Sequence, residues 1–114
     1  MEVKFCNSNL SNCLFTDANL KQATFRESNL HKSCFERANI QNSDFFKTQA
    51  KECNFTKSNL SHSCLREADF EQSNFTDANL SSTILDRTNM MMVVLAGTNF
   101  NQAIILNIRG NIEV

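Results

Sequence analysis

Few residues of this 114-residue chain have side chains that could do chemistry. The segment Ser61-His62-Ser63-Cys64 places an imidazole among two hydroxyls and a thiol, which are the groups that a nucleophilic site needs. The other histidine, His31, lies far away in the sequence. Glycine-rich phosphate loops are absent. Whether these groups can act together depends on the elements that position them.

A five-residue pattern recurs along nearly the whole chain. A small residue is followed by a polar residue, a large apolar residue and two polar residues, most clearly from Cys53 to Leu80. In an α-helix, five residues advance about 500°, so no apolar stripe would form. In a straight strand, successive apolar residues would point to opposite faces. The pattern therefore predicts a chain that turns a corner in every repeat, forming a solenoid of short parallel strands.

The large apolar residues alternate in size with a period of ten residues. Leu or Ile mostly occupies the intervening central positions, and phenylalanine occupies Phe5, Phe15, Phe25, Phe35, Phe45, Phe55 and Phe75. Like side chains stack only if each coil holds an even number of repeats, and we interpret the pattern as four. The prediction is an all-β fold of about five coils of twenty residues, with the two phenylalanine columns on opposite faces. Inward Ser and Thr should bond to backbone groups of the same or the next coil.

The repeat resembles that of the pentapeptide-repeat family, whose pattern is A(D/N)LXX. Thr16-Asp17-Ala18-Asn19-Leu20 and Thr76-Asp77-Ala78-Asn79-Leu80 carry the resemblance most clearly. The match runs from about Val3 to Ile105 in one register. The resemblance implies a right-handed quadrilateral parallel β-helix with four faces. We therefore divide the chain into a β-helix over residues 1–107 and a C-terminal tail or cap over residues 108–114.

In such a solenoid the candidate chemical groups separate. Ser63 points inward, and His62 and Cys64 flank a corner without an acid arranged behind the imidazole. His31 lies on a different face and coil from His62, and zinc-like spacing of Cys or His in three dimensions is absent. We therefore predict a non-enzymatic protein without catalytic, metal or cofactor sites.

The five cysteines are predicted to be reduced. Cys13 and Cys53 point inward two coils apart, at about 10 Å, which is too far for a disulfide. The other three face outward on separate stacks; they are Cys6, Cys34 and Cys64. The start of the chain lacks a secretory segment, so we expect a cytoplasmic location.

Outward side chains should stack as well. Amide side chains could form a ladder along the column of Asn19, Asn39, Asn59, Asn79 and Asn99. Charges alternate in sign along the column of Glu27, Lys47, Glu67 and Arg87. Neighbouring charges there should attract, although exposed pairs contribute only about 0–1 kcal/mol each.

The repeat weakens where Ala50 takes a central position and Phe46 an outward one. A kink or shallow groove could result. We favour the alternative in which Leu30 and Phe70, one coil away on either side, close over Ala50. Phe46 is then a candidate exposed contact for a partner.

From Ile84 onward, outward positions that were polar become apolar. They are Ile84, Met91, Met92, Val94, Ile104 and Leu106. An apolar end is expected to be covered, and we predict a homodimer through the C-terminal coil, with the tail contributing. Dimers joined in this way are common in the family that the chain resembles. The alternative is that these residues only pack under the tail.

The function favoured by the sequence is a rod-like scaffold or protein-interaction module. The resemblance offers an alternative, because some family members mimic B-form DNA, bind type II topoisomerases such as gyrase, and protect them from quinolones or peptide toxins. Mimicry requires rows of acids, and the candidates are Glu67, Asp69, Glu71 and Asp77. A net charge of −1 and nearby basic residues oppose it. The same balance argues against direct nucleic-acid binding, and a basic amphipathic stretch for a membrane is missing.

Overall fold

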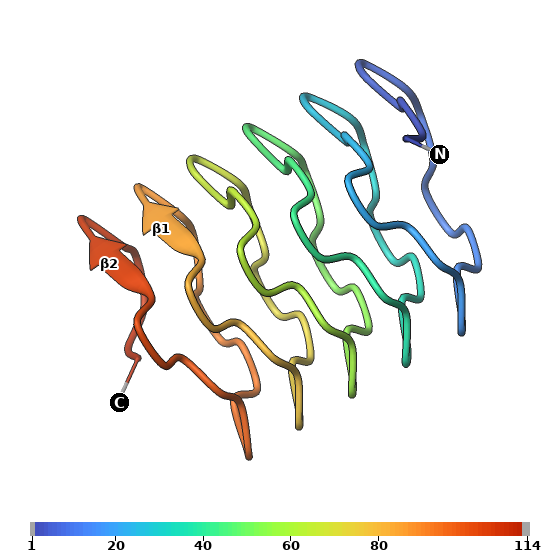
Figure 1. Cartoon of the computed structure of the whole chain (residues 1–114). Helices are drawn as coiled ribbons and strands as arrows, with labels where there is room; N and C mark the ends of the chain where they lie inside the picture. Colours follow the sequence, from blue (N-terminus) through green and yellow to red (C-terminus); the bar gives the residue numbers. More distant parts are fainter. Residues whose placement is uncertain (1, 113–114) are drawn as a thin grey trace.

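The computed structural model describes residues 2–112 and shows a right-handed quadrilateral β-helix (Figure 1). Successive coils stack along one axis, with the two ends of the chain at opposite ends of the stack. The molecule measures 32 × 21 × 20 Å along its principal axes. The predicted all-β solenoid is confirmed.

Backbone pairing joins residues that are twenty positions apart. Most contacts are single parallel bridges, such as Lys4 with Thr24 and Asn79 with Asn99. Near the C-terminus two segments lengthen into the parallel strands β1 (Ile84–Asp86) and β2 (Ile104–Leu106), with Ile84 opposite Ile104. The twenty-residue step agrees with the predicted coil length.

Ordinary residues make the corners, two positions after each central residue. Non-glycine residues there have φ values of 52° to 63°, and one corner is occupied by Gly97. This left-handed backbone costs about 1–2 kcal/mol per residue. Hydrogen bonds offset the cost: the amide of Ala18 closes a turn on the carbonyl of Phe15 at 3.0 Å, and the amide of corner residue Asp17 reaches Glu36 of the next coil at 2.9 Å.

Two phenylalanine columns fill the interior from opposite faces, as predicted. Within one column, the ring of Phe55 stacks on Phe35 at 4.9 Å and on Phe75 at 4.8 Å. Across the interior it meets the ring of Phe45 edge to face at 6.2 Å. All four rings are fully buried. Both packing geometries are favourable for aromatic pairs.

Ala50 does not interrupt the solenoid. It is fully buried, and the pairing continues from Gln49 to Asp69. In the next coil, the ring of Phe70 lies 6.1 Å from Phe45 and 5.6 Å from Phe55. A larger neighbour thus fills the space beside a small residue. The part of the favoured interpretation that concerns Phe70 is confirmed, and the alternative of a kink is wrong.

Most inward hydroxyls bond to backbone carbonyls of the preceding coil, whereas Ser58 and Thr83 donate to carbonyls of their own coil. Thr48 donates to Phe25 at 2.7 Å, and Ser73 donates to Ala50 at the same distance. The oxygen of Ser73 also accepts the amide hydrogen of Cys53 at 3.0 Å. Within residues 2–112, every buried side-chain nitrogen or oxygen has a partner. The predicted satisfaction of these groups is confirmed.

The ladder continues beyond residue 107, where the β-helix was expected to end. Arg109 forms a parallel bridge with Asn89, and its backbone bonds to Thr88 and Met90 at 3.0 and 2.8 Å. The register therefore persists at least two residues into the expected tail. Residues 113–114 lie outside the described part of the chain, so a cap remains a prediction. Over residues 2–112, the structure has no helix that is long and apolar enough to cross a membrane.

Candidate protein-interaction surface

The side chains that were considered as a possible nucleophilic or metal site have structural positions in the β-helix. Ser63 is buried, and its hydroxyl donates to the carbonyl of Ile40 at 3.0 Å. His62 is an exposed corner residue with φ of 61°. The Nδ1 atom of His31 accepts the amide hydrogen of Lys51 at 3.0 Å. Among residues 2–112, groups of three or more side chains able to hold a metal ion were not found.

All five cysteines are free. Cys53 is buried in the same inward column as Cys13, and Ser33 lies between them, since Cys13 donates its amide hydrogen to the hydroxyl of Ser33 at 3.1 Å. The thiol of Cys53 donates to the carbonyl of Leu30 at 2.9 Å. Burial raises the pKa of this thiol to about 12.

The six residues assigned to a dimer interface are all exposed: Ile84, Met91, Met92, Val94, Ile104 and Leu106. They do not form one patch. β1 and β2 carry Ile84, Ile104 and Leu106 on one side of the rod. Met91 and Met92 occupy the following corner.

Val94 lies on the opposite side of the rod from Ile84 and Ile104. It pairs with Asn74 and precedes Leu95, which continues the column of Phe75. That column faces the β1–β2 side across the interior, as the contact between Phe45 and Phe55 shows. A flat contact on one side therefore cannot bury both Val94 and Ile104.

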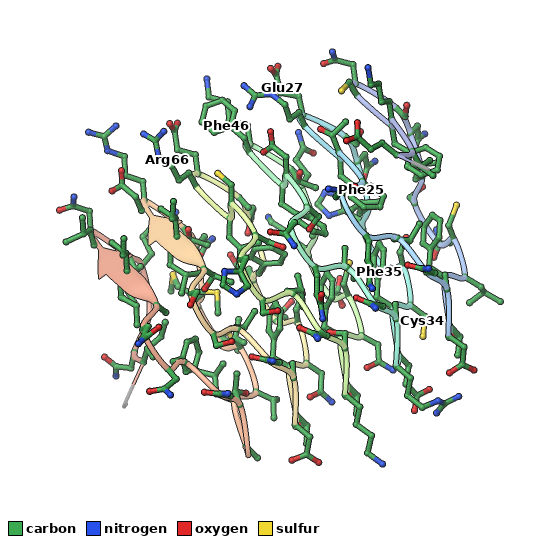
Figure 2. All side chains as sticks on the ribbon, viewed as in Figure 1. Phe25, Glu27, Cys34, Phe35, Phe46 and Arg66 are labelled. Carbon is green, nitrogen blue, oxygen red and sulfur yellow. The ribbon has the colours of Figure 1, made fainter. Side chains whose placement is uncertain are left out.

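Phe46 is half-buried beneath cationic side chains. The guanidinium carbons of Arg26 and Arg66 lie 4.5 and 5.9 Å from its ring centroid, and the Lys47 ammonium lies at 5.3 Å. Figure 2 shows Phe46 and Arg66 projecting outward from successive coils. Arg26 and Arg66 lie twenty residues before and after Phe46, so the coil length could have indicated this contact from the sequence.

The four acids proposed as partner contacts do not form a single cluster. Asn89 donates its amide hydrogens to Asp69 at 3.1 Å and to Glu71 at 3.3 Å, and the Lys51 ammonium lies 3.8 Å from Asp69. Glu67 precedes these acids at a corner of the same coil, whereas Asp77 occupies a later corner. The structure thus brings Asp69 and Glu71 together under positive and neutral partners, and leaves Asp77 apart.

The expected alternation of charge along the column of Glu27, Lys47, Glu67 and Arg87 produces no ion pair in the described part of the chain. Exposed corner charges gain too little energy to be held together. Instead, Arg26 pairs with Asp44 at 2.9 Å, and Arg66 with Asp86 at 3.6 Å.

Arg37 forms the most regular surface ion pair. Its guanidinium donates two hydrogen bonds to the carboxylate of Asp17, at 2.8 and 3.1 Å. The hydrogen bond from Arg37 lowers the pKa of Asp17, and the same bond raises the pKa of Arg37. A second acid, Glu36, lies 3.1 Å from Arg37. This cluster lies at a corner between the faces of Phe35 and Ile40, away from β1 and β2.

Leu14 is an exposed apolar residue that the sequence analysis missed. It is 82% exposed and pairs with Cys34 near the N-terminal end. The available signal was a leucine in the outward slot before Phe15, where the other repeats as far as Asn79 have a polar residue or cysteine. Leu14 stands alone and does not extend the apolar surface of the C-terminal coils.

Comparison with known proteins agrees with the geometry. The family model for pentapeptide repeats matches residues 8–45, 33–72, 53–91 and 73–105. A search of curated proteins found no significant sequence match. Among solved structures, the chain is similar to a pentapeptide repeat protein from the thylakoid lumen of Arabidopsis thaliana. The two are 20% identical with a TM-score of 0.69, and the alignment covers 87% of this chain and 62% of that one.

Two other solved structures have the same fold. HetL, a protein involved in heterocyst differentiation regulation in the cyanobacterium Nostoc sp. strain PCC 7120, is 18% identical with a TM-score of 0.58, over 89% of this chain and 56% of HetL. A trypsin-treated variant of QnrB1, a plasmid-mediated fluoroquinolone resistance protein, is 17% identical with a TM-score of 0.59, over 100% of this chain and 79% of QnrB1. This chain thus spans less than two thirds of the Arabidopsis protein and of HetL. Because the family model matches most of its length, the chain belongs to the pentapeptide-repeat family.

Proposed function

We propose that this protein is a non-enzymatic interaction scaffold that associates with a second copy of itself through its C-terminal coils. The observation that supports the proposal is the concentration of exposed apolar side chains from Ile84 onward, among them Met92 at 70%, Leu106 at 53% and Ile104 at 51%. Covering such side chains removes apolar surface from water and favours association. The rigid ladder of coils would present this surface without ordering any flexible segment.

A cytoplasmic location is part of this proposal. The five free cysteines support it, because thiols persist in reducing compartments and tend to pair in oxidising ones.

The double variant V94E/I104E is expected to be a soluble monomer, because it places charges on both sides of the proposed interface region. Light scattering coupled to gel filtration should give twice the chain mass of 13.0 kDa for the wild type and that mass once for the variant. Q22E/N42E adds the same charge at exposed corners of early coils and should remain dimeric. A monomeric wild type, or an unchanged mass in V94E/I104E, would contradict self-association.

A second candidate is DNA mimicry toward a type II topoisomerase. The pair of acids Asp69 and Glu71 on one coil favours it, since mimicry needs closely spaced negative charge. Lys51 and Asn89 oppose it, because they already engage these carboxylates. The similarity to QnrB1 shows a shared fold and is not evidence for a shared activity.

Gyrase supercoiling, titrated with the protein with and without a quinolone, tests this second candidate. We expect no inhibition at micromolar protein and no relief of quinolone-induced cleavage. If either effect appears, D69N/E71Q should abolish it, because the variant removes the two negative charges and keeps the side-chain shapes. That pair of results would replace the scaffold proposal with topoisomerase binding.

A further inference from the structure

We propose that two copies meet side by side, with their rods antiparallel, so that Leu106 of each copy covers Phe46 of the other. The surface involved is here called the β1–β2 face and consists of Asp44, Phe46, Cys64, Arg66, Ile84, Asp86, Ile104 and Leu106. The inference rests on the proposed self-association and specifies its surface and symmetry.

One column of this face consists of the outward residues that directly follow the large apolar residue of each repeat. From the middle of the rod toward the C-terminus, the column reads Phe46, Arg66, Asp86 and Leu106. Contacts between coils show that these side chains are neighbours, since Arg66 lies over the ring of Phe46 and pairs with Asp86. Asp86 in turn lies opposite Leu106 in the β1–β2 register.

The second column consists of the outward residues that directly precede the large apolar residue of each repeat. It reads Asp44, Cys64, Ile84 and Ile104, and each member pairs with the next through the backbone ladder. Ile84 and Ile104 are 37% and 51% exposed. Apolar side chains therefore occupy both columns toward the C-terminus, and Phe46 provides an aromatic ring toward the middle of the rod.

The first column is complementary to itself when its order is reversed. A two-fold axis parallel to the strands, between Arg66 and Asp86, places Leu106 opposite the other copy's Phe46. It also places Asp86 opposite the other copy's Arg66. Each contact occurs twice, as a two-fold interface requires. Apolar contacts then flank a central cluster of alternating charges, which fixes the register.

The second column accepts the same symmetry. Ile84 faces the other copy's Cys64, a small and weakly polar partner. Ile104 faces Asp44, whose carboxylate is engaged by Arg26 at 2.9 Å; this is the one apolar side chain of the face that meets a charged one.

Other arrangements fit these residues less well. With parallel rods, the two-fold axis would place Phe46 against Asp44 and Ile84 against Asp86, so two apolar side chains of each copy would face charged ones instead of one. A contact across the last coil would leave Phe46 unused. Val94, which lies on the opposite side of the rod, cannot join the β1–β2 face.

Disulfide trapping between two different variants tests the arrangement. In a C6S/C34S/C64S background, F46C and L106C are prepared separately, mixed, and oxidised mildly. The two positions are three coils apart in one chain, about 14 Å, and cannot be linked within it. We expect the mixture to form a disulfide-linked dimer at least tenfold faster than either variant alone. The matched control mixes F46C with V94C, which should cross-link at the background rate.

The outcomes separate this inference from the proposed self-association. A dimeric mass without selective F46C–L106C cross-linking would overturn the antiparallel contact and leave self-association standing. A monomeric mass for the wild type would overturn both.

Charge reversal provides an independent test. R66E and D86R should each raise the dimer dissociation constant at least tenfold, because each places like charges across the axis, and R66E/D86R should restore it. The matched pair R37E and D17R, which alters the ion pair away from the β1–β2 face, should leave the constant unchanged. Single reversals at Arg66 and Asp86 without effect would overturn the proposed register.

Discussion

Replacing Phe55 with alanine is expected to lower the free energy of unfolding by about 3–5 kcal/mol. Its ring is fully buried and stacks on Phe35 and Phe75 at 4.9 and 4.8 Å. It also meets Phe45 and Phe70 edge to face. In a solenoid each coil contacts only its neighbours, so the cavity weakens two coil–coil interfaces at once. Total stability is typically about 5–15 kcal/mol, and urea unfolding followed by circular dichroism would measure the loss.

The control is F46A, which truncates a phenylalanine on the surface of the same rod, with both variants measured at a protein concentration low enough for the proposed dimer to dissociate. Its ring lies between guanidiniums, and their cation–π contacts contribute about 0.5–1 kcal/mol at exposed sites. We expect F46A to cost no more than about 1 kcal/mol on this basis. Equal losses in F55A and F46A would show that the stacked interior column does not dominate stability.

The interior could be predicted because a strict period constrains it. Once twenty residues form a coil, the neighbours of every inward side chain follow by arithmetic, and Phe35, Phe55 and Phe75 must stack. The same arithmetic placed Ala50 between Leu30 and Phe70. Close packing then required a larger neighbour to take up the space beside the small residue.

In the asparagine column, the repeat length predicts the positions of the residues but not their hydrogen-bond partners. Its residues are stacked as predicted, but their amides do not form the expected ladder. The Oδ1 of Asn59 accepts the amide hydrogen of Ser61 at 3.0 Å, and Asn79 does the same for Ser81 at 2.9 Å. A bond to a backbone group two residues away competes well with one to another coil, because little chain must be ordered to form it. A pattern of residue types does not decide between the two partners.

The sequence predicted which residues of the candidate surface are exposed, but it did not predict how all of their side chains are arranged. Outward slots identified Ile84, Val94 and Ile104 correctly as exposed. The twenty-residue coil length also predicts that Val94 lies on the opposite side of the rod from Ile84 and Ile104, so this division could have been derived from the sequence. The position of the Phe46 ring beneath Arg26 and Arg66 depends on rotamers of long flexible side chains, which the repeat does not specify.

Raising the pH above 9 is expected to destabilise the fold through Cys53. The ordinary pKa of this thiol is 9.0, and burial raises it to about 12. Below pH 9 the thiol is protonated in both the folded and the unfolded chain. Between pH 9 and 12 the unfolded chain releases the proton while the folded chain keeps it, so unfolding becomes more favourable as pH rises. At 1.36 kcal/mol per unit, the loss across this window is on the order of 4 kcal/mol.

The variant C53A isolates this effect, because lysine and arginine side chains titrate alike in both proteins. Below pH 9, C53A should be less stable than the wild type by a constant amount, since it lacks the thiol and its bond to Leu30. Above pH 9 that difference should shrink by roughly 1.4 kcal/mol per pH unit. Parallel stability curves up to pH 11 would mean that the thiolate is accommodated in the folded state. A shrinking difference would show that the inward column stays dry around this thiol, as close packing of the coils requires.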